Sequence, residues 1–287
     1  MTTNWGRWPE APERGALNLV TPEATRRGLA CVREGRTLSL GLEISADAPR
    51  APHRAPAQHF LTRDGGDYAA GLTERPGYGY ADDTIVLACH GTTHVDALSH
   101  VWQDGLMWDG ISADNVTSRG ASFAGIETMG PVVTRGLFVD ARELGFLHGP
   151  TDVLRAADVA AALQTAGLDP QPGDALVVRT GWLEDWRNGT SEDDRWQGLH
   201  ADVGVWAGEA GIAVIGADNI SVERNPSGEA CALPLHVAAI RDRGIPLLEL
   251  LDLELMSSQR TSAFCLAFSP LRIRGGSGSP IAPIAIV

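Results

Sequence analysis

Three histidines and an aspartate are concentrated in the eleven residues His90-Gly-Thr-Thr-His94-Val-Asp96-Ala-Leu-Ser-His100. The whole chain has only eight histidines, so this density singles out the segment. His90, His94 and Asp96 supply two imidazoles and a carboxylate, which can hold a divalent metal with positions left open for water. His100 is a candidate proton carrier because imidazole titrates near neutral pH. The segment therefore predicts a metal site that activates water.

Backbone geometry limits how these side chains can meet. On a continuous helix, His90 and His94 share a face while Asp96 and His100 point roughly the other way. On a continuous strand all four share a face, but His90 and His100 lie about 33 Å apart. We therefore expect a turn at residues 91–93, preceded by a buried strand over 84–89 that brings His90 to the end of a sheet. The alternative is a solvated loop that is rich in histidine.

A second pair of candidates lies in the C-terminal half. His236 begins an expected helix over 236–243, and Glu249 lies in an apolar strand expected over 245–251. A carboxylate in an apolar strand is costly to bury without a partner, and a cation or a protonated imidazole would satisfy it. The alternative is a solvated histidine at a helix start and a solvated glutamate on an edge strand.

Composition limits the classes of partner. The net charge of −13 with few basic clusters argues against nucleic acid or an anionic membrane surface. No apolar run approaches the roughly 18 residues of a membrane span, and the N-terminus lacks the pattern of a signal peptide. The cysteines, at positions 31, 89, 231 and 265, form no Cys-x-x-Cys pair. Buried free thiols in a cytoplasmic protein are the simplest interpretation.

The remaining pattern indicates an α/β protein with a mixed sheet. We expect one domain over residues 1–287, with residues 1–30 as an N-terminal arm, and a long loop over 46–82. The expected strands cover 37–45, 132–140, 175–179, 212–216, 245–251 and 261–269. The expected helices cover 22–34, 156–166, 200–210 and 236–243.

The histidine-rich segment resembles the signature His-x-Gly-Thr-His-x-Asp-x-Pro-x-His of the cyclase family of metal-dependent hydrolases, which includes bacterial kynurenine formamidase and isatin hydrolase. Glycine stands one place early, at Gly91, and Leu98 replaces the usual proline. The matching residues are His90, Thr93, His94, Asp96 and His100. The resemblance continues through residues 131–136, 173–174, 179–182, 216–219 and 275–280.

The resemblance implies a β/β/α arrangement of the swivelling-domain type. It also implies that His236 and Glu249 belong to the active site, either as metal ligands or as partners of the ligands. We predict that Glu249 is a metal ligand and that His236 is a catalytic residue. Family members are commonly homodimers or homotetramers, so we expect one of these states. We also expect Trp5 and Trp8 to dock on a neighbouring subunit or over the pocket.

The chemistry that fits these residues is hydrolysis of a C–N bond in a small, aromatic or cyclic substrate, such as an amide, a formamide or a cyclic imide. Ligation by nitrogen and oxygen without thiolate fits Zn²⁺ or Mn²⁺. The aromatic residues Trp102, Trp108, Phe60 and Tyr80 are candidates for a flat wall around the substrate, and the alternative is that they belong to the core. A lactonase or a true cyclase would use the same site, and a non-catalytic protein with a structural metal is a further alternative.

Overall fold

The computed structural model describes residues 3–72, 77–259 and 261–287. Within these residues, one large sheet has nine strands in the order β1-β15-β13-β7-β9-β11-β12-β4-β14. Its central strands β7, β9, β11 and β12 run parallel, and the pairings on both sides of them are antiparallel. The strands are β1 (Thr37–Ser39), β4 (His94–Asp96), β7 (Val132–Asp140), β9 (Ala175–Arg179), β11 (Val214–Ala217), β12 (Leu247–Glu249), β13 (Ala263–Phe268), β14 (Gly278–Pro280) and β15 (Ile284–Ile286). The prediction of an α/β protein with a mixed sheet is confirmed.

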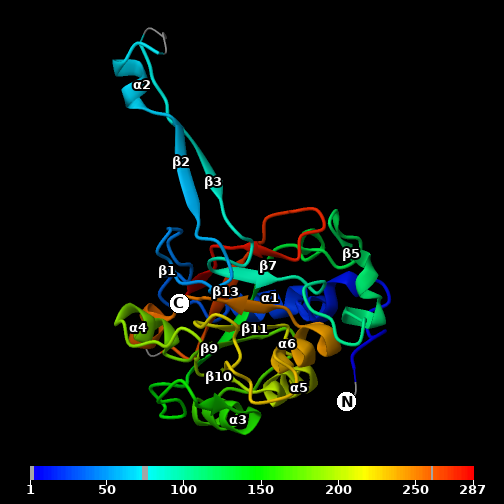
Figure 1. The fold of residues 1–287 in the computed structure, drawn as a ribbon. Helices are drawn as coiled ribbons and strands as arrows, with labels where there is room; N and C mark the ends of the chain where they lie inside the picture. Colours follow the sequence, from blue (N-terminus) through cyan, green and yellow to red (C-terminus); the bar gives the residue numbers. More distant parts are fainter. Residues whose placement is uncertain (1–2, 73–76, 260) are drawn as a thin grey trace.

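Helices and short elements surround this sheet (Figure 1). The helices are α1 (Pro22–Leu29), α2 (Gly65–Ala69), α3 (Ala156–Thr165), α4 (Trp182–Arg187), α5 (Ala201–Ala210), α6 (Pro234–His236), which continues as a π-helical turn over Val237–Arg241, and α7 (Glu254–Gln259). A kinked 3₁₀ segment covers Pro12–Leu19, and single 3₁₀ turns cover Trp108–Gly110, Ala113–Asn115 and Ile126–Thr128. The small two-stranded sheets pair β2 (Gln58–Arg63) with β3 (Asp82–Val86), β5 (Val116–Thr117) with β6 (Gly120–Ala121), and β8 (Val153–Leu154) with β10 (Gly198–Leu199).

The sheet separates two apolar cores. Successive side chains of a strand point to opposite faces, so Leu176 and Val178 of β9 join one core while Ala175 and Val177 join the other. The first core also contains buried residues of α3 and α5. Because β9 and β11 are covered on both faces, their residues form nearly continuous apolar runs, which is why the sequence pattern located them.

Local signals explain the helix ends. The imidazole of His200 accepts the backbone N–H of Asp202 and so caps the N-terminus of α5. Gly211 follows that helix with a φ of +77°, the left-handed conformation that ends many helices. The expected helices over 156–166 and 200–210 are confirmed to within a residue or two.

One prediction from the apolar pattern is wrong. Residues 84–89 do not form a buried strand, because β3 pairs only with β2 in a hairpin that projects from the body, with α2 at its outer end (Figure 1). Ile85 and Val86 are 49% and 54% exposed. An apolar run records only that the residues favour a strand, and tertiary structure decides what covers the strand. The hairpin and α2, here called the arm, also replace much of the loop expected over 46–82.

The N-terminal tryptophans contact their own chain and do not line the cavity beside the histidines, whereas docking on a neighbouring subunit stays a prediction. The indole of Trp5 donates to the carbonyl of Arg241 at 2.8 Å, and the guanidinium of that arginine lies 4.8 Å from the ring centroid. Trp8 packs against Trp108, with 6.0 Å between ring centroids. These contacts attach the first residues to the helical side of the fold.

Two further features bear on the environment of the chain. No helix in the described ranges is long and apolar enough to cross a membrane. All four cysteines are free; Cys265 is buried, whereas Cys31, Cys89 and Cys231 are partly exposed. The expectation of buried thiols therefore holds for Cys265 alone.

Candidate metal centre

Strand β4 carries the first two ligands to the centre of the site. It lies between β12 and β14, and its register sets His94 directly opposite Glu249 and Asp96 opposite Gly278. His94 and Asp96 are two residues apart, so both side chains leave the same face of the sheet. The Nε2 atom of His94 lies 3.2 Å from a Glu249 oxygen and 3.5 Å from an Asp96 oxygen. An antiparallel pairing therefore unites residues that are far apart in sequence.

A turn returns His90 to the same place. Gly91 donates its N–H to the carbonyl of Ala88, and the Nδ1 atom of His90 then lies 2.8 Å from Asp96 Oδ1. The chain turns at residues 89–90 and bends over 91–93, so the turn expected over 91–93 is confirmed and begins two residues earlier. Gly278 leaves the space for this ring, because a Cβ at that position would lie 2.5 Å from the His90 Cε1 atom.

His236 approaches from the helical side. Its Nε2 atom lies 3.2 Å from a Glu249 oxygen and 3.6 Å from Asp96 Oδ2. The helix α6 starts at Pro234, so His236 lies in its first turn rather than at its first residue. Glu223 binds that first turn, accepting the backbone N–H groups of Leu235 and His236.

A partner holds the remote nitrogen of each of three rings. His236 Nδ1 lies 2.5 Å from Glu223 Oε1, and His94 Nδ1 donates to the carbonyl of Thr92 at 2.7 Å. His90 Nε2 lies 3.0 Å from the hydroxyl of Ser277. Such partners fix the ring orientation and tautomer of metal-binding histidines. Each ring therefore presents its other nitrogen toward Asp96.

The atoms that face each other at this point lack hydrogen-bond partners. His90 Nδ1, His94 Nε2 and both oxygens of Asp96 are buried without one. Buried polar atoms are costly when unsatisfied, so a cluster of them indicates a missing ligand. Ligand atoms of His90, His94 and Asp96 lie within 4.8 Å of one another, and so do those of Asp96, His100 and His236. The residues fit a divalent ion, and because Asp96 belongs to both groups they fit two.

Charge interactions set the protonation of the cluster. Burial raises the pKa of Asp96, but the surrounding histidines outweigh it and hold the pKa well below 3.8. Burial likewise lowers the pKa of His94, but the neighbouring carboxylates of Asp96 and Glu249 raise the pKa to about 9. The pKa of His236 is raised well above 6.5 by Glu223 and Glu249 against the effect of burial. In the metal-free chain, protons occupy the imidazole positions that a cation would take.

His100 differs from the other three histidines. Burial lowers its pKa to about 4, with the charges of His90 and His236 acting in the same direction against Asp96. Its Nε2 atom lies 3.9 Å from Asp96, and its ring stacks on His90 with 4.2 Å between centroids. A neutral imidazole at neutral pH can accept a proton.

The structure does not bring the four expected aromatic residues to the cluster. Trp108 is 1% exposed in the helical core, where its indole donates to the carbonyl of Pro12. Phe60 lies on the exposed strand β2 and Tyr80 just before β3, both on the arm. Trp102 lies two residues after His100 but is 49% exposed. None of the four lines the cavity at the cluster within this chain, and a role for them in binding substrate stays a prediction.

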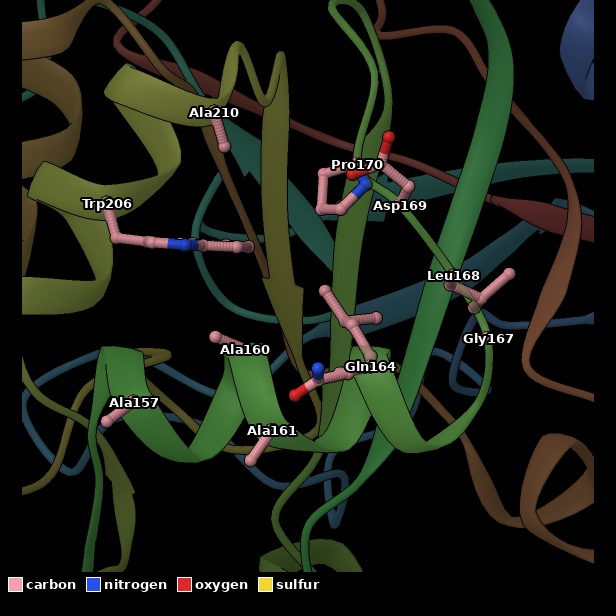
Figure 2. Close-up of a pocket in the computed structure, with 11 residues that line it drawn as sticks. Ala157, Ala160, Ala161, Gln164, Gly167, Leu168, Asp169, Pro170, Trp206 and Ala210 are labelled. Carbon is pink, nitrogen blue, oxygen red and sulfur yellow. The ribbon is translucent and has the colours of Figure 1, made fainter.

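The cluster opens into a cavity of about 250 Å³. His100, His236 and Glu249 lie at this cavity, and its apolar lining includes Trp196 and Ile220. A larger hollow of about 910 Å³ lies between α3 and α5, beside Trp206 and Gln164 (Figure 2). Its lining is mostly apolar and contains one ionisable side chain, Asp169. The smaller cavity is therefore the candidate for chemistry.

Sequence reasoning missed Glu223, Ser277 and Arg54. Glu223 precedes His236 by thirteen residues, a spacing that no regular element explains. Ser277 lies in the glycine-rich segment before β14, and Arg54 lies in the stretch expected to be a loop. Only the general tendency of loops to carry functional residues pointed to the last two.

Comparison with known proteins shows the family to which the chain belongs. The Cyclase family model matches residues 38–224, and the chain belongs to this family. Cyclase-like protein 2 of Oryza sativa subsp. japonica is 27% identical over 205 residues, which cover 70% of this chain and 63% of that protein. The chain therefore spans less than two thirds of that curated relative.

Solved structures share the fold. A crystal structure described as a novel cyclase is 32% identical, with a TM-score of 0.91 and coverage of 100% of both chains. Isatin hydrolase A from Labrenzia aggregata, solved with benzyl benzoate bound, is 19% identical, with a TM-score of 0.66 and coverage of 90% of this chain and 95% of that chain. The resemblance noted from the histidine-rich segment is confirmed.

We expect the metal-free chain to lose stability as the pH rises from 6.5 to 9. The pKa of His94 is raised from 6.5 to about 9 in the folded chain, so the stabilisation by its proton is complete below 6.5 and is lost as the pH rises through 9. The raised pKa of His236 acts in the same direction. Because a divalent ion replaces these protons, Zn²⁺ or Mn²⁺ should stabilise the chain more at the upper pH. Chemical unfolding with and without the ion measures both effects.

The control is a pair of isosteric substitutions. Asp96→Asn removes the carboxylate shared by the cluster and should abolish the stabilisation by metal. Asp83→Asn alters an exposed residue of the arm that pairs with His59, and it should leave the stabilisation intact. Full metal content in Asp96→Asn would contradict the assignment of the site.

Proposed function

We propose that the protein is a metal-dependent hydrolase that cleaves a C–N bond of the amide, formamide or cyclic-imide type in a small substrate. The observation that carries the proposal is the set of buried, unpartnered imidazole and carboxylate atoms around Asp96, which opens into a cavity. Membership of the cyclase family and the shared fold with isatin hydrolase A support the same class of reaction.

The residues divide into two roles under this proposal. His90, His94, Asp96 and Glu249 hold the ion, which when bound lowers the pKa of a water and polarises the substrate carbonyl. His100 accepts the proton of the water and returns it to the leaving nitrogen, since its ring lines the cavity and its Nε2 atom lies 3.9 Å from Asp96.

The environment of His236 differs from that of His100, the proposed proton carrier. We expected it to be catalytic, and in this chain Glu223 contacts its Nδ1 atom while Glu249 and Asp96 lie beside its Nε2 atom. This environment favours a role as a ligand or as a partner of Glu249. Nitrogen and oxygen ligation supports Zn²⁺ or Mn²⁺, and elemental analysis of protein purified without chelator distinguishes them.

Two alternatives use the same residues. A lactonase or a true cyclase needs the same metal and base, and only the leaving atom or the direction differs. A non-catalytic protein with a structural metal is the other alternative. Structural sites are closed by four protein ligands, whereas this cluster lines a cavity and includes a neutral histidine, which favours catalysis.

The reaction class is tested with matched substrates. We expect the metal-loaded protein to hydrolyse an N-formyl arylamine or a cyclic imide faster than the isosteric ester or lactone after correction for intrinsic reactivity, because His100 can protonate a leaving nitrogen. Steady-state kcat/KM values measure the difference. An ester preferred by about 100-fold, equivalent to about 2.7 kcal/mol in barrier, would favour the lactonase instead.

The role of His100 has its own test. His100→Ala should retain the metal and lose about 10²- to 10⁴-fold in kcat, the usual contribution of a positioned acid or base. His53 lines the same cavity without contacting the cluster, so His53→Ala is the matched control and should retain kcat. Loss of the metal in His100→Ala would make this residue a ligand, and an unchanged kcat would remove it from the mechanism.

We also propose that the chain forms a homodimer or a homotetramer. The support is the arm, because an isolated two-stranded hairpin is marginal in water and this one exposes Phe60, Leu61, Ile85 and Val86. Light scattering should show an oligomer, and replacement of residues 58–86 by a short Gly-Ser linker should reduce its mass. A wild-type monomer would contradict the proposal. The four free cysteines support a cytoplasmic location.

A further inference from the structure

Arg54 is a cationic group in the candidate active-site cavity. It lies in the connection between β1 and the arm, and it lines the cavity together with His100, His236 and Glu249. The side chain is partly buried, and its Nη1 atom donates to the backbone carbonyl of His90. This contact holds the guanidinium beside one of the metal-site histidines.

The guanidinium of Arg54 is not neutralised by the protein. Among residues 3–72, 77–259 and 261–287, no carboxylate lies within the 4.0 Å of an ion pair, and the carbonyl of His90 is the acceptor that its side chain contacts. The carboxylates that line the cavity are already engaged, because Glu223 lies 2.5 Å and Glu249 3.2 Å from nitrogens of His236. The Nε and Nη2 donors of Arg54 therefore remain for a ligand.

Other arginines with restricted exposure are engaged differently. Arg179 contacts Asp140, Glu184 and Glu254, and Arg135 contacts Asp174. Arg224, which lines the same cavity as Arg54, donates both terminal nitrogens to the carbonyls of Thr151 and Ser227. Among the described residues, Arg224 therefore has both terminal nitrogens bound and only its buried Nε without a partner, whereas Arg54 keeps its Nε and Nη2 donors beside the metal-site histidine His90.

The chemistry of the free donors identifies the ligand. A guanidinium presents parallel N–H groups that match a carboxylate, and this geometry is stronger and more selective than a bond to a neutral acceptor. The net charge of −13 disfavours polyanions in general, but one local cation can accept one carboxylate. Trp196, Ile220 and Leu233 supply an apolar lining for the remainder of a small molecule.

We propose that Arg54 binds a carboxylate carried by the substrate, so that the enzyme acts on N-acyl amino acids and related carboxylated amides in preference to neutral amides. This inference rests on the proposed C–N hydrolysis. The same guanidinium could instead contact the carboxylate that hydrolysis creates at the reacting carbon. Two substrates that differ only in a carboxylate outside the scissile bond separate these possibilities. Both substrates yield a carboxylate at the reacting carbon on hydrolysis, but only one of them carries a carboxylate beforehand.

The test uses N-formylphenylalanine and N-formyl-2-phenylethylamine, which differ only in the carboxylate. The zinc-loaded wild-type protein should prefer the first compound in kcat/KM. Arg54→Ala should lower kcat/KM for the carboxylated compound by about 10- to 100-fold, the scale of a charge-assisted bidentate contact, and change the neutral compound by less than about threefold. Added guanidinium ion should restore part of the loss. Arg54→Lys keeps the charge without the planar fork and should lie between the two.

Arg224→Ala is the matched control, because it removes a cavity arginine whose terminal nitrogens are already bound, and it should affect both compounds equally. Metal content measured in every variant shows whether the contact to His90 supports the site.

Parallel losses on both compounds in Arg54→Ala would overturn the proposal, and so would a wild-type protein without a preference for the carboxylate. If neither compound is hydrolysed, the proposed function fails, and calorimetric binding of the same pair decides the role of Arg54. A preference for the carboxylated compound that Arg54→Ala abolishes supports the proposal, whereas no preference, or one that persists in the variant, overturns it.

Discussion

The carboxylate of Asp96 is the group on which the site depends. It is fully buried, and neither of its oxygens has a hydrogen-bond partner among the described residues. An isolated charge in such a place is very costly, so it requires cationic neighbours. Nitrogens of four imidazoles lie between 2.8 and 3.9 Å from its oxygens. The arrangement around Asp96 is therefore incomplete without either protons on the histidines or a metal between them.

Neighbouring strands and the first turn of α6 hold the metal-site side chains in position around Asp96. Pairing of β4 with β12 sets Glu249 against His94, and β14 provides Gly278, where a side chain would collide with His90. On the helical side, one carboxylate, that of Glu223, binds both the first turn of α6 and the ring of His236. Because the partners of these rings belong to buried backbone and short loops, the ligand geometry exists before a ligand arrives, which lowers the cost of binding.

The same arrangement gives the histidines of the cluster different protonation states. His94 and His236 lie against carboxylates that favour their protonated forms, while burial and cationic neighbours keep His100 neutral. Environments that push the pKa values of similar side chains apart commonly distinguish the acid, the base and the electrostatic partners of an active site. Identical residue types thus acquire different roles within a few ångströms.

The sequence by itself determined the residue types of the metal centre, the family and the central strands. His90, His94, Asp96 and His100 were identifiable because they fall within one short segment, and β9 and β11 because strands covered on both faces form continuous apolar runs. The pairing of His236 with Glu249 required the resemblance, since their spacing has no regular period. Glu223 and Arg54 were not identifiable, because their roles come from contacts across 13 and 36 residues.

Only the tertiary structure decided which apolar and aromatic residues are covered. The run 84–89 and the aromatic residues Phe60 and Tyr80 favour strands, yet they lie on or beside a hairpin outside the body, whereas Trp108 is buried in the core. Intrinsic preference for a strand or for apolar surroundings is a local property of the side chain. Which surface meets that side chain depends on where the rest of the chain goes, and a local pattern does not contain that information.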